Sequence, residues 1–213
     1  MIDQNSKRSL EPSMFSFFND LPNICSLAGL GCALLGIYFA VLGNFHFALI
    51  GVLWATLFDW GDGIIARNIK GRTEIQGAFG ANLDSLIDIV SFGVFPAVFL
   101  LSYGEFNPLF LPGAFILIAV STIRLSYFNI YGMIDKKTYR GLAIDNNVII
   151  LAFLFLFEGL FTHTLFSIIL YVVLMIMPIL NLASIRTYKF DGKWVYVLIG
   201  YVIGMTVIYC CIN

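Results

Sequence analysis

The sequence predicts an all-α membrane protein, a polytopic bundle of about seven helices. Sixty per cent of the 213 residues are hydrophobic, 12% are charged, and the mean hydropathy is +0.90. A soluble domain is about 25% charged, and even a domain of about 150 residues buries only about 70% of its unfolded surface. A soluble monomer, a disordered chain and a secreted disulfide scaffold are therefore disfavoured. A net charge of −1 gives no basic field for a nucleic acid, and the cysteines, in or beside apolar runs, form neither a disulfide nor a zinc pattern.

Seven apolar segments are each treated as one crossing, for which a helix needs about 20 residues over about 30 Å of hydrocarbon. They are residues 24–42, 45–65, 80–102, 109–131, 147–161, 165–183 and 194–212. The boundary between the fifth and the sixth is the least marked and falls at residues 162–164. A single helix over 147–182 would run roughly 54 Å at about 1.5 Å per residue, which is too long for one crossing. A break at 162–164 is therefore predicted.

The positive charges all fall on one side of this seven-span arrangement. The connections between spans 1 and 2, 3 and 4, and 5 and 6 contain no Lys or Arg. Because cytoplasmic loops carry the excess of Lys and Arg, the N-terminus is predicted inside and the C-terminus outside. The twelve residues are Lys7, Arg8, Arg67, Lys70, Arg72, Arg124, Lys136, Lys137, Arg140, Arg186, Lys189 and Lys193.

Residues 1–20 are predicted to be a tail, and residues 21–213 a single membrane domain. Lys7 and Arg8 are followed by a mixed segment, so the tail is not a secretory signal. Phe15, Phe17 and Phe18 stand just before the first span. They either lie on the membrane surface as an interfacial segment or belong to an ordinary tail, and the sequence leaves both open.

Four aspartates stand where apolar residues are expected, in FDWGDGIIARNIKGRTEIQGAFGANLDSLIDIVSFG. Asp59 and Asp62 end the second span, and Asp84 and Asp88 begin the third. An ionised Asp at the centre of a membrane helix costs about 2.5–3.5 kcal/mol. The spacing of each pair puts its carboxylates on one stripe of a helix. A short loop makes the two helices antiparallel, so Asp59 is expected level with Asp88, and Asp62 with Asp84.

Four carboxylates at one depth require positive charge. Two divalent cations would balance them, and all-oxygen ligands suit Mg²⁺ or Mn²⁺. Gly63 and Gly80 leave room for a ligand at the backbone, and Arg67 can meet a phosphate bidentately. The alternative is that the acids cap helices or pair with the basic residues Arg67, Lys70 and Arg72.

This segment resembles the signature of the CDP-alcohol phosphatidyltransferase family, D-x2-D-G-x2-A-R followed by G-x3-D-x3-D. The loop between the two halves is longer here than is usual in the family, but it lies outside the helical stripes. The matching positions are Asp59, Asp62, Gly63, Ala66, Arg67, Gly80, Asp84 and Asp88.

Within the family, the chain looks most like the phosphatidylserine synthase branch over roughly residues 20–145. The shared features include Leu21-Pro22-Asn23-Ile24, Leu83-Asp84-Ser85-Leu86, Ser91-Phe92-Gly93-Val94 with Pro96, and Arg124-Leu125 with Phe128-Asn129. Where that branch tends to have Gly-Leu-Pro, this chain has Gly141-Leu142-Ala143 and then Asp145-Asn146-Asn147. This difference bears on the acceptor alcohol.

The resemblance implies a six-helix core and transfer of the phosphatidyl group from CDP-diacylglycerol to an alcohol, with release of CMP. L-Serine is the leading acceptor, and glycerol 3-phosphate, inositol, choline and ethanolamine are the alternatives. The resemblance further implies a homodimer in the plasma (inner) membrane with its active site facing the cytoplasm. By resemblance, Asp59, Asp62, Asp84 and Asp88 hold two Mg²⁺ or Mn²⁺ ions, Asp88 is also the general base, and Asp62, Gly63, Ala66, Arg67 and Gly80 receive the CDP-lipid.

Four further residues are candidates for the acceptor or the head group, each with a structural alternative. Arg124 contacts a carboxylate or a lipid phosphate, or it snorkels to the interface. Asn129 is a similar candidate. Asn23 touches the cytidine or caps a helix. Ser91 lines the acceptor pocket or bonds back to its own helix.

Two other classes of function compete with the transferase. A cation transporter would use the same acids but needs polar residues through both leaflets, and the outer halves of these spans have almost none. A non-catalytic assembly protein would not need the complete acid set. Glu158, in the fifth span, receives no role.

Overall fold

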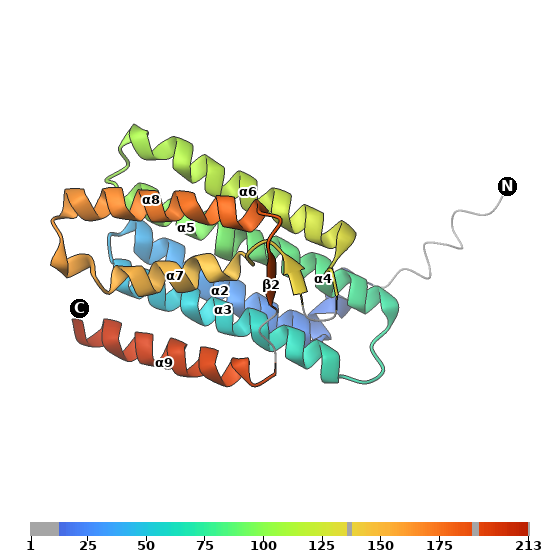
Figure 1. Ribbon diagram of the computed structural model, residues 1–213. Helices are drawn as coiled ribbons and strands as arrows, with labels where there is room; N and C mark the ends of the chain where they lie inside the picture. Colours follow the sequence, from blue (N-terminus) through green and yellow to red (C-terminus); the bar gives the residue numbers. More distant parts are fainter. Residues whose placement is uncertain (1–12, 136–137, 189–191, 213) are drawn as a thin grey trace.

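The structure is a computed structural model that describes residues 13–135, 138–188 and 192–212. Its long helices lie side by side in one bundle (Figure 1), which confirms the predicted all-α fold. The helices are α2 (Leu21–Val41), α3 (Phe45–Asn68), α4 (Glu74–Asp88), α5 (Phe95–Tyr103), α6 (Leu111–Tyr131), α7 (Asp145–Phe155), α8 (His163–Leu182) and α9 (Trp194–Ile212). The shorter elements are η1 (Met14–Asn19), η2 (Ile89–Val94), η3 (Pro108–Phe110), β1 (Thr138–Arg140), η4 (Glu158–Leu160) and β2 (Arg186–Tyr188).

Six helical segments in the described part of the chain are long and apolar enough to cross a membrane, so the expected seven full-length spans are corrected to six. The exception is the fifth expected span, 147–161, where α7 ends at Phe155 and η4 follows as a short 3-10 turn. At about 1.5 Å per residue, α7 alone is too short to cross. The predicted break at 162–164 is confirmed, because Thr162 caps α8 by accepting a hydrogen bond from Leu165 N. Figure 1 shows this turn at the end of the bundle away from the two strands.

Helices α2 and α3 pack closely because small residues face each other between them. A Cβ atom on Gly51 of α3 would lie 2.8 Å from Gly36 N of α2. Small residues at such crossings let two helix backbones approach within van der Waals contact. This contact fixes the position of α3, and with it the acidic stripe at the end of that helix.

The end of the bundle opposite the strands is filled by aromatic side chains. Phe99 and Tyr103 of α5 pack against Phe155 of α7, with ring centroids 5.4 and 5.5 Å apart, and Phe166 of α8 packs on Phe155 at 5.6 Å. Tyr103 Oη donates a hydrogen bond to Glu158 at 3.0 Å, which gives that carboxylate a structural partner. This half of the protein is therefore a packed core.

The third span changes its winding just after Asp88. Residues Ile89–Val94 form a π-helical turn, and Pro96, which has no backbone N–H to donate, follows it at the start of α5. Single π turns widen a helix and occur frequently at functional sites. The acidic half of this span, α4, is thereby separated from the core-packing half, α5.

Two short strands lie where the α6–α7 connection meets the α8–α9 connection. Strands β1 and β2 pair antiparallel with Tyr139 opposite Thr187, and Figure 1 shows them beside the ends of α7 and α8. Thr187 Oγ1 donates a hydrogen bond to Gly141 O, which ties β2 to the segment that enters α7.

The N-terminal segment joins the same end of the molecule. Phe17, in η1, stacks on Phe79 of α4 with ring centroids 4.1 Å apart, whereas Phe15 and Phe18 are exposed. Residues 1–12 of the expected tail lie outside the described residues. Contact of Phe15 and Phe18 with a membrane surface stays a prediction.

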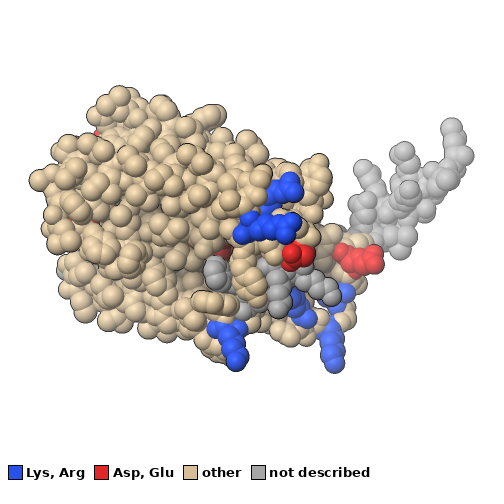
Figure 2. All heavy atoms as spheres, in the orientation of Figure 1, with Lys and Arg blue, Asp and Glu red and all other residues tan. Residues whose placement is uncertain are grey.

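The Lys and Arg side chains visible on one face of the molecule lie together. On the face shown in Figure 2, the Lys and Arg side chains gather at one end, and the remainder of this face is almost free of charge. Lys7, Arg8, Lys136, Lys137 and Lys189 lie outside the described residues.

Candidate active site

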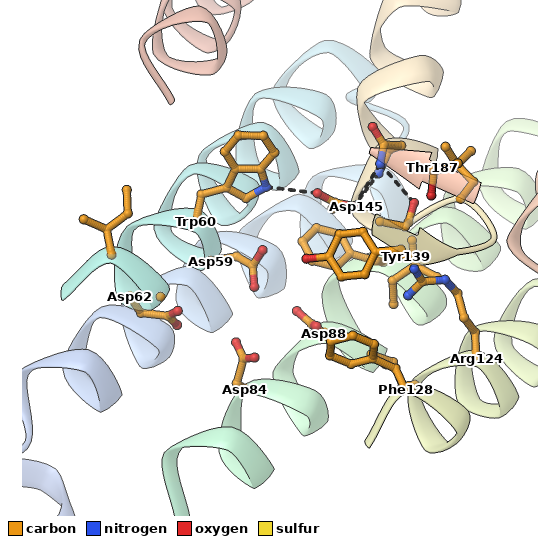
Figure 3. Close-up of a pocket in the computed structure, with 18 of the residues that line it drawn as sticks. Asp59, Trp60, Asp62, Asp84, Asp88, Arg124, Phe128, Tyr139, Asp145 and Thr187 are labelled. Atoms are coloured by element: carbon orange, nitrogen blue, oxygen red, sulfur yellow. Dashed lines mark hydrogen bonds between the residues drawn. The ribbon is translucent and has the colours of Figure 1, made fainter. Parts of the chain in front are cut away.

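Four aspartates from two neighbouring helices face one common space (Figure 3). Asp59 and Asp62 lie toward the end of α3, and Asp84 and Asp88 lie toward the end of α4. One oxygen each of Asp59, Asp84 and Asp88 lies within 4.8 Å of the other two. We call these three residues the carboxylate cluster. The predicted apposition of the two acidic stripes is thus present in the structure.

Asp62 stands slightly apart because a third helix holds it. Ser26 on α2 donates a hydrogen bond from Oγ to Asp62 Oδ2. Asp62 lines the same cavity but lies outside the carboxylate cluster. Asp62 and the three residues of the carboxylate cluster thus differ in their surroundings, because the hydroxyl group that contacts Asp62 comes from α2.

The carboxylate cluster fits a hard divalent cation. It offers only oxygen ligands, which Mg²⁺ and Mn²⁺ prefer. Asp88 Oδ1 is buried and has no hydrogen-bond partner among the described residues. The one ion pair found among those residues joins Arg72 to Asp20, so the basic loop does not neutralise the cluster. Because a buried carboxylate without a positive partner is costly, this arrangement favours a bound cation.

A cavity of about 280 Å³ opens beside these acids. Gly63 and Arg67 lie on its wall, and Arg124 of α6 lies on it as well. Its other lining residues include Trp60, Ile64, Phe92, Leu125, Phe128, Tyr139, Leu142, Ala143, Asp145, Asn146, Thr187 and Tyr188.

The far wall contains residues for which the sequence predicts no role. Asp145, the first residue of α7, accepts a hydrogen bond from Trp60 Nε1 at 2.9 Å (Figure 3). Tyr139 and Thr187 reach the cavity from the paired strands. Burial, reinforced by the negative charge of Asp145, raises the pKa of Tyr139 to about 12, so its hydroxyl stays protonated at neutral pH. In the sequence, the one feature that could have pointed to this wall is Asp145, which lies where the segment after Gly141 departs from the family pattern.

Gly80 and Asn23 lie beside Arg72. A Cβ atom on Gly80 would overlap Arg72 Nη2 and lie 3.0 Å from Asn23 Oδ1. Asn23 also donates to Phe17 O at 3.0 Å, so it fastens η1 to α2. The space beside Gly80 that was expected to admit a ligand is thus partly filled by Arg72 from the longer loop.

Three other candidates do not line this cavity. Ser91, in the π turn, is buried with no hydrogen-bond partner for Oγ among the described residues. Asn129 exchanges hydrogen bonds with Ser85 at 3.1 and 3.2 Å. Ala66 is on the acidic face of α3, one turn after Asp62. Their assigned roles stay predictions.

Comparison with known proteins gives consistent relatives. The chain is 31% identical to an archaetidylserine synthase of Methanothermobacter thermautotrophicus over 176 residues, 82% of this chain and 72% of that protein. It is 34% identical over 116 residues to a CDP-diacylglycerol–serine O-phosphatidyltransferase of Methanocaldococcus jannaschii, and 31% identical over 117 residues to one of Bacillus subtilis. These two alignments span 54% and 53% of this chain and 52% and 62% of the relatives. A sequence model of the CDP-alcohol phosphatidyltransferase family matches residues 19–206. This chain therefore belongs to the CDP-alcohol phosphatidyltransferase family.

Proposed function

We propose that this protein transfers the phosphatidyl group of CDP-diacylglycerol to L-serine, releasing CMP and forming phosphatidylserine. The observation that carries the reaction class is the convergence of Asp59, Asp84 and Asp88 at one side of a cavity that also contains Arg67. The names of the three relatives support serine as the acceptor. Glycerol 3-phosphate, inositol, choline and ethanolamine are the acceptors against which it must be tested.

The carboxylate cluster, together with Asp62, would hold two divalent cations, Mg²⁺ or Mn²⁺. Bound there, such ions stabilise negative charge on the pyrophosphate and on the leaving CMP. Ser26 orients Asp62 from outside this set, as residues around a metal site commonly do.

Asp88 is the general base in this proposal. Its buried Oδ1 has no hydrogen-bond partner among the described residues, so it is free to accept the proton of an acceptor hydroxyl. The acceptor oxygen then forms a bond to the lipid-linked phosphorus as the bond from that phosphorus to CMP breaks. Asp88 receives the proton, and CMP leaves with the bonding electron pair.

The nucleotide would lie against the end of α3. Arg67 presents a guanidinium that can bind phosphate oxygens bidentately, and Gly63 leaves its backbone open, with Arg67 Nη1 the nearest side-chain atom at 3.5 Å from a Cβ at that position. Asp62, Ala66 and Gly80 complete the proposed CDP-lipid residues, with Arg72 beside Gly80.

The location of the site suits substrates of mixed polarity. We place it at the cytoplasmic side of the plasma membrane, because the basic residues lie at the end of the bundle that carries the acids. CDP then enters from the cytoplasm, while the acyl chains stay in the bilayer. Residues 21–213 would act as one membrane domain and associate as a homodimer. The packed aromatic half disfavours a transport path.

The test is an assay of CMP release by the purified protein with CDP-diacylglycerol and a panel of alcohols, with and without Mg²⁺ or Mn²⁺. We expect metal-dependent release with L-serine and a lipid product that contains serine. Asp88→Asn should strongly lower turnover, whereas Glu105→Gln, at an exposed carboxylate outside the cavity lining, should not. Release with a different alcohol alone would reassign the acceptor, and the absence of release with every alcohol would overturn the reaction class.

A further inference from the structure

Two side chains of opposite charge line the same cavity without pairing with each other. Arg124 comes from α6 and Asp145 from the start of α7. Figure 3 shows both on the side of the cavity away from Asp62. Among the described residues, no Lys or Arg nitrogen lies within 4.0 Å of the Asp145 carboxylate.

Asp145 is held in place by uncharged donors. Its Oδ2 accepts from Trp60 Nε1 at 2.9 Å, and its Oδ1 accepts from Asn146 N and Nδ2 at 3.0 and 3.1 Å. These bonds fix the carboxylate, and none of their donors carries a charge. Since each carboxylate oxygen has two acceptor positions, Oδ2 can take one more hydrogen bond. Asp145 also lies outside the carboxylate cluster, so it is not one of the grouped metal ligands.

Arg124 has a hydrogen-bond donor to offer to a ligand of negative charge. It is only 8% exposed, and its Nε is buried with no hydrogen-bond partner among the described residues. A guanidinium presents five donors in a flat fork that matches a carboxylate. A buried donor without a partner is costly, which indicates that a ligand group completes this site.

We propose, on the basis of the phosphatidyl transfer inferred above, that Asp145 binds the ammonium group of an amino-acid acceptor whose carboxylate is bound by Arg124. The substrate class is thus a zwitterionic hydroxy amino acid, with its hydroxyl directed toward Asp88 on the same cavity. An acceptor that lacks either charge leaves one of the two residues unpaired, and sites of this kind reject such analogues strongly. Asp145 is accordingly a specificity-determining residue outside the eight-position motif.

The first test compares three acceptors with the wild-type protein. L-Serine carries both charges, ethanolamine lacks the carboxylate, and 3-hydroxypropionate lacks the ammonium group. We expect kcat/KM for L-serine to exceed that for either analogue by at least about tenfold, the ratio that corresponds to about 1.4 kcal/mol. Equal values for L-serine and 3-hydroxypropionate would overturn the proposal.

The second test separates the two charges with matched variants. Asp145→Asn keeps an acceptor for Trp60 but loses the charge, so it should raise KM for L-serine and ethanolamine by at least about tenfold and leave KM for 3-hydroxypropionate unchanged. Arg124→Gln should raise KM for L-serine and 3-hydroxypropionate and spare ethanolamine. Glu105→Gln serves as the charge-matched control. An equal change for all acceptors in Asp145→Asn would show a merely structural role and contradict the proposal.

A binding measurement keeps this proposal distinct from the proposed reaction. L-Serine should raise the Tm of the wild-type protein with Mn²⁺ and CMP present, and Asp145→Asn should lose this shift. No CMP release with any acceptor, together with a serine-dependent shift lost in Asp145→Asn, would overturn the reaction and retain the ammonium site. CMP release with serine, together with no effect of Asp145→Asn, would retain the reaction and overturn the ammonium site. If Asp145→Asn does not fold, Asp145→Glu and the wild-type acceptor ratio decide.

Discussion

Arg72 Nη2 lies 2.7 Å from Asp20 Oδ2, and this ion pair ties the loop after α3 to the residue that precedes α2. Arg72 also donates to Gln76 O at 3.1 Å and to Asn23 Oδ1 at 3.4 Å. The side chains of Arg72 and Asp20 are only 15% and 6% exposed, so water screens the pair little. The longer loop thus reaches back over Gly80.

Asp20→Asn is expected to destabilise the protein, because it leaves Arg72 without a charged partner. Hydrogen bonds to charged groups contribute about 1.5–3 kcal/mol, and a loss in that range should lower Tm. Thermal unfolding in detergent measures the effect. Glu74→Gln, an exposed carboxylate in the first turn of α4, is the control and should leave Tm within error. Equal Tm values for Asp20→Asn and wild type would mean that the pair adds nothing to stability.

Gly80→Ala and Gly77→Ala should have opposite effects although both lie on α4. The new methyl group at position 80 would overlap Arg72 Nη2, whereas nothing lies within 4 Å of a Cβ at position 77. Gly80→Ala should therefore displace Arg72 and lower both Tm and CMP release. Gly77→Ala should raise stability by about 0.5–1 kcal/mol, since Ala is the better helix former. Parallel changes in the two variants would argue against this contact.

Ser26→Ala is expected to weaken metal binding without removing a ligand. It deletes the hydroxyl that donates to Asp62 Oδ2, and loss of such an orienting partner typically lowers metal affinity roughly 10–100-fold. The measurement is the Mn²⁺ concentration that gives half-maximal CMP release. Ser16→Ala, in exposed η1, provides the control. An unchanged midpoint in Ser26→Ala would contradict the orienting role of Ser26.

Asp88→Asn is expected to lower kcat by about 10²–10⁴-fold, the range attributed to a positioned general base. KM for CDP-diacylglycerol should change much less, because Arg67 and Gly63 provide the nucleotide contacts in our proposal. Steady-state kinetics at saturating metal separate the two parameters. A near-normal kcat would remove Asp88 from the base role.

Tyr103→Phe tests whether the aromatic end of the bundle is purely structural. It removes the hydrogen bond to Glu158 at 3.0 Å, which should cost about 0.5–1.5 kcal/mol of stability. Because Tyr103 lies at the opposite end from the acids, kcat and KM should stay as in wild type. A changed KM would reveal coupling between the two ends.

The apposition of Asp59 and Asp88 was predictable because both helices carry a periodic stripe and one short loop fixes their direction. The position of Asp62 was not, since the deciding hydroxyl belongs to Ser26 on a helix distant in sequence. Tyr139 and Thr187 lie in the connections between helices, and Asp145 is the first residue of α7, so helical periodicity does not place them at the cavity. Residues 156–161 are mostly apolar and so resemble the end of a span, but they form a turn around Glu158.

The π turn at Ile89–Val94 lets the two halves of the third span, α4 and α5, differ in their rotation about the helix axis. In an uninterrupted α-helix, one inserted or deleted residue turns everything beyond it by about 100°. Here the wider winding between Asp88 and Phe95 is the place where such a change in length can be taken up. The orientation of the acids and the fit of Phe99 and Tyr103 into their neighbours can thus be adjusted separately, and evolution can alter either half without realigning the other.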